Sequence, residues 1–228
     1  MTNSTIKSEQ PLIGKGLLYS EKEATELLHE GNQLKKVDLI DGQIRKSWEY
    51  SEVFDQGNTS MNVGCVWTTY VASISPGESL GMTDAEFARS LYHEAQVSGP
   101  WDGTEAESKY GASVLTVGRL LKEKKFFNEL AWTKDVNILS NHVLAQGPAI
   151  VASRWTSEMS KVDPNGFVRP NGSYEGNHCW IVYGVDDQWE TFFALNSWGR
   201  DFGKDGKFLV KFSDMEKILQ DGFAIATF

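Results

Sequence analysis

The stretch Gly-Asn-His-Cys-Trp-Ile-Val-Tyr-Gly-Val-Asp occupies residues 176–186, and Leu-Asn-Ser-Trp-Gly occupies residues 195–199. Apolar, β-branched and aromatic runs bounded by glycine are typical of strands. His178 begins one run, and Asn196 ends another eighteen positions later. On neighbouring strands, the amide of Asn196 can hold one ring nitrogen of His178 and leave the other for proton transfer, as in nucleophilic enzymes. Trp198 can cover that hydrogen bond and keep water away from it.

The remainder of the second half also predicts strands. Short β-branched or aromatic runs lie at 149–152, 192–195 and 207–212, separated by Gly, Pro and Asn turns. A long loop rich in turn residues precedes the strand of His178. The second half is therefore expected to fold as antiparallel strands.

The first half predicts helices. Residues 63–74 are long and apolar enough for a buried helix. Thr83 and Glu86 have the spacing of a capping box, which predicts a helix to about Ala95. A third helix is expected over 113–124, where Val and Leu recur at helical spacing. A helical half followed by a strand-rich half predicts an α+β protein with a ligand cleft between the halves.

Composition narrows the functional classes. The chain has 228 residues, with 22 basic and 31 acidic side chains and a net charge of −9. This balance disfavours nucleic acid as a partner, because affinity for nucleic acid comes largely from Lys and Arg. No run reaches the roughly 18 apolar residues that a membrane span needs, and no signal peptide is visible at the start. We expect a cytoplasmic or phage/virion-associated protein with no membrane partner.

Gln56 lies in a loop just before the predicted buried helix. A side-chain amide beside the N-terminal N–H groups of a helix suits an oxyanion hole, since partial positive charge gathers at that helix end. Gln56 is therefore a candidate for stabilising a negative charge during catalysis.

Together these motifs resemble the papain-like cysteine peptidases, especially bacterial and phage-type members. The resemblance covers the chain from about Trp48 to the C-terminus and rests on four segments in the family's order. They are Gln56-Gly57, Gln146-Gly147-Pro148, Asn177-His178 and Asn196-Ser197-Trp198-Gly199.

The resemblance implies a two-lobed fold with a helical N-terminal lobe and an antiparallel β-barrel-like C-terminal lobe. It implies an N-terminal arm over 1–45 and a peptidase domain over 46–228, whose lobes divide at about residue 140, into 46–140 and 141–228. It also implies a peptide or protein substrate, and neither a metal nor another cofactor is expected. The implied roles are oxyanion amide for Gln56, base for His178, orienter for Asn196, supporting cover for Trp198 and substrate contact for Asn177.

The nucleophile departs from the family pattern. In the family, Cys follows the Gln by six positions, and here that position is Asn62, whereas Cys65 follows by nine. In one register, Asn62 replaces the nucleophile and Cys65 lies one turn further along the helix. In the other, the loop has three extra residues and Cys65 is the nucleophile. Asn62 is an excellent N-cap, which favours the first register.

The two registers imply different activities. A thiolate paired with imidazolium attacks a carbonyl, whereas a carboxamide nitrogen has no comparable lone pair. One hypothesis is a papain-like peptidase, or a protein derived from one, that acts on peptide bonds in the cleft. The alternative is an inactive binding or structural module, natural or engineered, for example part of a larger particle. Acyl transfer or glutamine deamidation would use the same groups as the peptidase.

Other reactive side chains have simpler interpretations. Cys179 follows His178 on a strand and should point to the opposite face, buried inside the barrel-like lobe. No disulfide between Cys65 and Cys179 is expected. The remaining histidines, His29, His93 and His142, lack metal-ligand spacing and are expected at the surface or at helix caps. Trp155 or Trp101 is a candidate for lining a substrate groove.

Overall fold

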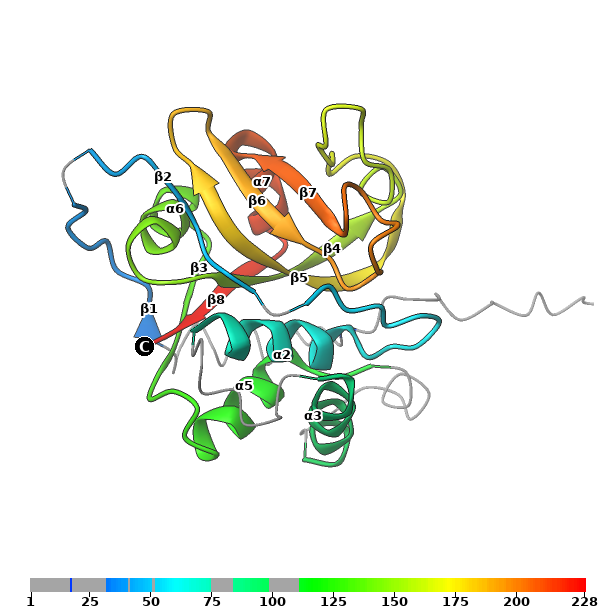
Figure 1. Ribbon diagram of the computed structural model, residues 1–228. Helices are drawn as coiled ribbons and strands as arrows, with labels where there is room; N and C mark the ends of the chain where they lie inside the picture. The colour runs from blue at the N-terminus through cyan, green and yellow to red at the C-terminus, as the bar shows by residue number, and fades with distance from the viewer. Residues whose placement is uncertain (1–16, 18–31, 41, 51, 75–83, 99–110) are drawn as a thin grey trace, which may run out of the picture.

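A computed structural model describes residues 17, 32–40, 42–50, 52–74, 84–98 and 111–228. Three helices, α2 (Asn62–Ile74), α3 (Ala85–Ser98) and α5 (Val114–Glu123), form a lobe on one side of a sheet (Figure 1). Two more, α6 (Val136–Ala145) and α7 (Phe212–Gln220), pack on the sheet's other face. The α+β fold class is confirmed.

The sheet has eight strands, which pair in the order β1-β3-β8-β4-β5-β6-β7, and β2 pairs with β5 off this path. Their bounds are β1 Asn32–Gln33, β2 Arg45–Ser47, β3 Leu130–Thr133, β4 Ala149–Thr156, β5 Tyr174–Asp186, β6 Thr191–Leu195, β7 Lys207–Lys211 and β8 Phe223–Thr227. Only the β1–β3 pair is parallel among the strands that the structure describes. The strand-rich lobe is thus an open, mainly antiparallel sheet rather than a closed barrel. All four predicted strands are present.

Helix α2 is buried along nearly its whole length, although it carries several hydroxyl groups. The Thr68, Thr69 and Ser73 hydroxyls donate to carbonyls one turn earlier, at 2.8–3.1 Å, so they need no water. Gly64 permits α2 to lie close to α3, because a Cβ at this position would collide with the Ala88 carbonyl. These features place the start of α2 firmly in the core.

Helices α3, α5 and α6 begin at side-chain caps, whereas Lys211 makes no side-chain capping hydrogen bond at the start of α7. Ser113 accepts hydrogen bonds from the first turn of α5, and Asp135 does so for α6. Asp84 accepts from the backbone N–H groups of Glu86 and Phe87 at the start of α3. Thr83 of the predicted capping box lies outside the described residues. The carboxylate of Asp84, one position after Thr83, caps the start of α3.

Alternation along β4 and β5 divides the core between the two faces of the sheet. Ala152 and Cys179 contact the cluster of the helical lobe, whereas Val151 and Trp180 belong to the cluster with α6 and α7. The prediction that Cys179 points into the strand-rich lobe is therefore wrong. His178 instead contacts Trp155, which belongs to the cluster with α6 and α7.

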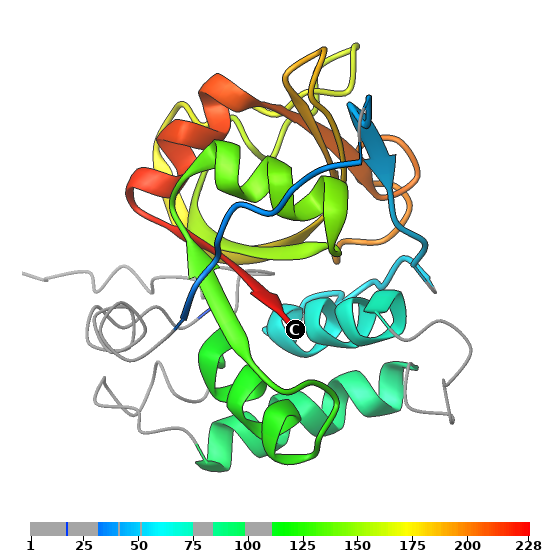
Figure 2. The ribbon, with the colours of Figure 1, turned by 90° about the vertical axis from the view of Figure 1, so that its left-hand side faces the viewer.

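Residues 32–40, drawn in blue in Figure 2, cross the end of α6, which is drawn in green. We call residues 32–40 and 42–48 the N-terminal strap. Trp48 Nε1 donates to Val143 O at 2.7 Å and Gln43 Nε2 donates to Leu144 O at 2.6 Å. Asn141 exchanges two hydrogen bonds with the Val37 backbone. The strap thus satisfies carbonyls that the end of a helix leaves without intrahelical partners.

His142 lies in this same region, and the prediction that it is a surface or cap residue is wrong. Its side chain is buried and contacts Gln146 Oε1 and the Pro148 carbonyl, at 2.9 and 3.3 Å. Burial lowers the pKa of His142, because the cost of desolvating the charged ring is larger than the opposing effect of these two hydrogen bonds.

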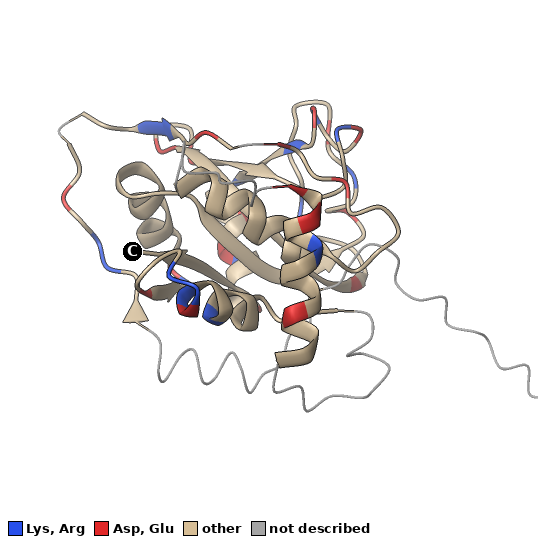
Figure 3. Cartoon of the chain, turned by 60° about the horizontal axis from the view of Figure 1, so that its bottom comes forward, with Lys and Arg blue, Asp and Glu red and all other residues tan. Residues whose placement is uncertain are grey.

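The described surface mixes the two signs of charge. Figure 3 shows Lys and Arg interspersed with Asp and Glu in that view. Near α5, Lys122 pairs with Glu129 and Lys124 pairs with Glu94, both at 3.0 Å. No helix in the described part of the chain is long and apolar enough to cross a membrane.

Candidate functional site

Three side chains from different elements meet where α2 begins beside β5. Asn62 is the first residue of α2, His178 lies on β5, and Asn196 follows β6. Asn62 Nδ2 lies 3.0 Å from His178 Nδ1, and His178 Nε2 lies 2.7 Å from Asn196 Oδ1. All three are buried, with Asn62 and His178 both 0% exposed. The structure thus brings these three residues together.

The hydrogen bonds define the state of the imidazole. Asn62 Oδ1 accepts from the backbone N–H of Val63 at 2.9 Å, so its Nδ2 faces His178 as a donor. His178 Nδ1 must then accept, and its Nε2 carries the proton that it donates to Asn196. Asn62 Nδ2 also lies 3.4 Å from Cys179 Sγ. The neutral imidazole thus has one nitrogen bound on each side.

Two tryptophans cover the His178 ring. The Trp198 ring lies 4.8 Å from it, tilted, and the Trp155 ring lies 5.0 Å from it, edge-on. Trp198 therefore lies where the sequence predicts it. Trp155 is fully buried, so it packs beneath the site and the prediction that it lines a groove is wrong. Trp101 lies outside the described residues.

Gln56 is buried in the loop just before α2 and bridges to the segment after β6. Its Nε2 donates to Thr59 O at 2.8 Å, and its Oε1 accepts from the Ser197 hydroxyl at 2.6 Å. The Ser197 backbone N–H in turn donates to Asn196 Oδ1 at 2.8 Å. A polar chain therefore runs from Gln56 through Ser197 and Asn196 to His178 and Asn62.

Sequence reasoning missed Ser197 and Thr59 as members of this network. Ser197 lies between two predicted site residues, which is a usable signal. Thr59 is one of several polar loop residues, and nothing in the sequence distinguishes its carbonyl as the acceptor for Gln56.

Cys65 lies one turn along α2 in a different environment. It packs in a small apolar cluster with Phe54 and Ala88 and is 2% exposed. Burial raises the pKa of the Cys65 thiol to about 12, with smaller contributions from the negative charges of Asp55 and Glu52. Since the thiolate is the nucleophilic form, Cys65 has almost none of it at neutral pH.

The other predicted residues have less specific surroundings. Cys179 is buried and its pKa lies well above the ordinary value because of desolvation, and neither cysteine is in a disulfide. Asn177 is half-buried beside His178, opposite Arg154 of β4. His93 is exposed, as expected, and His29 lies outside the described residues.

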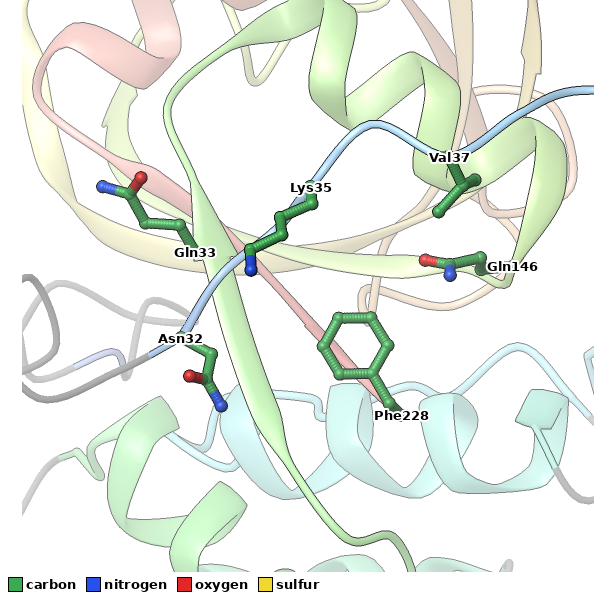
Figure 4. A pocket seen from close by; sticks show the side chains of 6 residues that line it. All are labelled: Asn32, Gln33, Lys35, Val37, Gln146 and Phe228. Carbon is green, nitrogen blue, oxygen red and sulfur yellow. The ribbon is translucent and has the colours of Figure 1, made fainter.

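The described residues outside this network form no metal site, and they line a cavity that includes none of the network's side chains. Within the described ranges, no group of three or more His, Cys, Asp or Glu residues could hold a metal. A cavity of about 370 Å³ lies instead beneath the N-terminal strap (Figure 4). It is lined by Asn32, Gln33, Lys35, Val37, Gln146 and Phe228.

Comparison with known proteins gives matches at the level of structure alone. No protein-family model and no curated protein sequence matches the chain. Xylellain, a cysteine protease from Xylella fastidiosa, superposes with a TM-score of 0.68 at 13% identity, covering 98% of this chain and 100% of that one.

Eukaryotic proteases superpose as well. Procathepsin L2 from the larval midgut of Tenebrio molitor has a TM-score of 0.63 at 15% identity, covering 96% of this chain and 80% of its own. The bromelain protease of Ananas comosus, solved with the inhibitor E64, has 0.57 at 16% identity, covering 79% and 97%. The chain therefore has the fold of the papain-like cysteine proteases.

Proposed function

We propose that the protein is a peptidase-derived binding or structural module that does not cleave peptide bonds. In this proposal Asn62 stands where a papain-like peptidase carries its nucleophilic Cys. The observation that carries it is the 3.0 Å contact between Asn62 Nδ2 and His178 Nδ1, the nitrogen through which a base would activate the nucleophile.

The chemistry of the groups supports an inactive centre. A Cys/His/Asn hydrolase needs a thiolate that attacks the carbonyl and an imidazole that returns the proton to the leaving amine. The carboxamide nitrogen of Asn62 cannot supply that attack, because its lone pair is delocalised into the carbonyl. Cys65 is a poor substitute, since its thiol is buried among apolar side chains with a pKa of about 12.

The partner that we propose is a peptide or protein, as expected for a scaffold with a peptidase fold. We also propose a bacterial or phage-type lineage and a cytoplasmic or virion-associated location. The full coverage of the bacterial protease xylellain supports the lineage.

Cysteine labelling tests the loss of activity. The wild type, N62C and N62C/H178A are incubated with an epoxide peptidase inhibitor at neutral pH, and adducts are mapped by mass spectrometry. We expect N62C to be labelled at residue 62 at least roughly a hundredfold faster than Cys65 of the wild type, because a thiol facing the imidazole has a depressed pKa. The H178A change should remove that labelling.

Hydrolysis of a fluorogenic peptide library gives the second measurement. We expect no turnover above the no-protein control for the wild type. Turnover by the wild type, or rapid labelling of Cys65 that disappears in H178A, would contradict the proposal and establish Cys65 as the nucleophile of an active peptidase.

A further inference from the structure

The contact between Asn62 and His178 also joins the two lobes. Asn62 begins α2, the central helix of the helical lobe, and His178 belongs to β5 of the sheet. Both side chains are 0% exposed, and the 3.0 Å hydrogen bond is the polar contact between them. Breaking this bond would leave two buried polar groups to find new partners.

The bond exists in only one protonation state of the imidazole. Asn62 Nδ2 is a donor, so His178 Nδ1 must be unprotonated to accept from it. The Nε2 proton is already directed at Asn196 Oδ1, at 2.7 Å. A second proton can therefore enter the ring only at Nδ1, where it would face the N–H group of Asn62.

Rotating the Asn62 amide does not relieve the conflict between its N–H group and a proton on His178 Nδ1. Asn62 Oδ1 would turn towards the protonated ring, but it would leave the backbone N–H of Val63, from which it accepts at 2.9 Å. The amide nitrogen would then face that N–H group, donor against donor. Neither orientation of the amide satisfies both His178 in its charged form and the Val63 N–H group.

We propose that Asn62 and His178 form an interlobe latch, which a proton on His178 opens. The latch is closed while the imidazole is neutral and loosens the start of α2 from β5 when the ring becomes charged. It does not depend on whether the protein cleaves peptides, so it can fail or succeed independently of the proposed function.

Other ionisable groups lie on the elements around the ring. Cys65 on α2 and Cys179 on β5 both have raised pKa values because they are buried. The charged side chains nearby include Glu175 on β5, which accepts from the Ser160 hydroxyl at 3.0 Å, and Glu52 and Asp55 before α2. Arg154 on β4 pairs with Asp221, and Arg200 after Trp198 pairs with Asp205. Asp55 is exposed and Oδ1 of its carboxylate accepts from the Gly57 backbone.

Hydrogen exchange of the full chain tests the latch at pH 7 and pH 5, with rates corrected for the intrinsic effect of pH. We expect protection in the first turn of α2 and around Cys179 to fall roughly tenfold or more at pH 5, as the unmade buried hydrogen bond implies. The peptide that spans His142 to Pro148 reports any fall caused by the other buried histidine of the described chain, and the fall at the start of α2 should exceed it and persist in H142Q.

The N62D variant supplies the matched comparison. A carboxylate of the same shape accepts from the charged ring and from Val63 N–H together, so N62D should keep its protection at pH 5. Unchanged protection in the wild type, or a parallel fall in N62D, would overturn the proposal.

Nitrogen NMR spectra of the His178 imidazole test the latch even if N62D does not fold. The wild type should show the Nε2-protonated form at pH 7, and its ring should become charged over the same pH range in which α2 loses protection. A ring protonated at Nδ1 at pH 7, or one that stays neutral through the loss of protection, would also overturn the latch.

Discussion

The side chain of Asn62 acts as a hydrogen-bond donor and as an acceptor at the same time. Its oxygen accepts from Val63 N–H and its nitrogen donates to His178, so one carboxamide satisfies a helix end and an imidazole together. The sequence predicts Asn62 as the N-cap of the buried helix, but the structure places it as the first helical residue.

Truncation of Asn62 should therefore weaken the folded state. We expect N62A to lower the free energy of unfolding by about 1–3 kcal/mol, because it leaves His178 Nδ1 and the Val63 N–H group buried without this partner. Urea denaturation at pH 7 measures the change.

Asn177 provides the control, because it is an asparagine of the same region that is only half-buried. N177A should cost clearly less than N62A. Equal losses in the two variants would show that the Asn62 hydrogen bonds contribute nothing specific.

Spacing along the chain predicts much of the site at the level of single residues. The eighteen-residue interval between His178 and Asn196 correctly indicates two side chains on adjacent segments, now 2.7 Å apart. The orientation of Cys179 is less accessible, because alternation separates the two faces of a strand without saying which face meets the helices.

At the level of elements, the contact between α2 and α3 depends on a missing side chain. An added Cβ at Gly64 would collide with backbone rather than with a flexible side chain, so the helices would have to move apart. We expect G64A to lower the free energy of unfolding by about 1–3 kcal/mol, as overpacked cores usually do.

Gly147 is a suitable control, because a Cβ there would meet His142 Nε2 at 3.9 Å, an ordinary contact. Thermal unfolding should show G147A close to the wild type and G64A clearly below it. If G64A is as stable as G147A, α2 and α3 do not need their close approach.

Helix α6 is absent from the sequence predictions for a physical reason. The sequence of α6 buries Ser140, Asn141 and His142 among its apolar residues, which obscures the amphipathic pattern. Partners from distant segments satisfy these groups, among them Val37 for Asn141 and Asp187 for Ser140. Tertiary contacts of this kind leave no local signal.

At the level of the whole molecule, stability should depend on pH through His142. Burial lowers the pKa of His142 in the folded protein below its ordinary value of 6.5. The unfolded chain then binds a proton more readily, so the contribution of this residue is complete above about pH 6.5 and is lost as the pH falls below it. The stability of the wild type should decrease between pH 7 and pH 5.

Denaturation curves at several pH values separate this effect from others. H142Q should show a shallower loss of stability over that range than the wild type, whereas H93Q should follow the wild type because His93 is exposed. Identical pH dependence in H142Q and the wild type would contradict the assignment.

The position of β8 has a consequence for the order in which the sheet can be completed during synthesis. β8 (Phe223–Thr227) lies between β3 and β4, both of which leave the ribosome earlier. Until residue 223 emerges, those two strands face a gap with an open edge on each side. A nascent chain that stalls just before β8 would therefore expose two unpaired strand edges, the form most prone to join other chains.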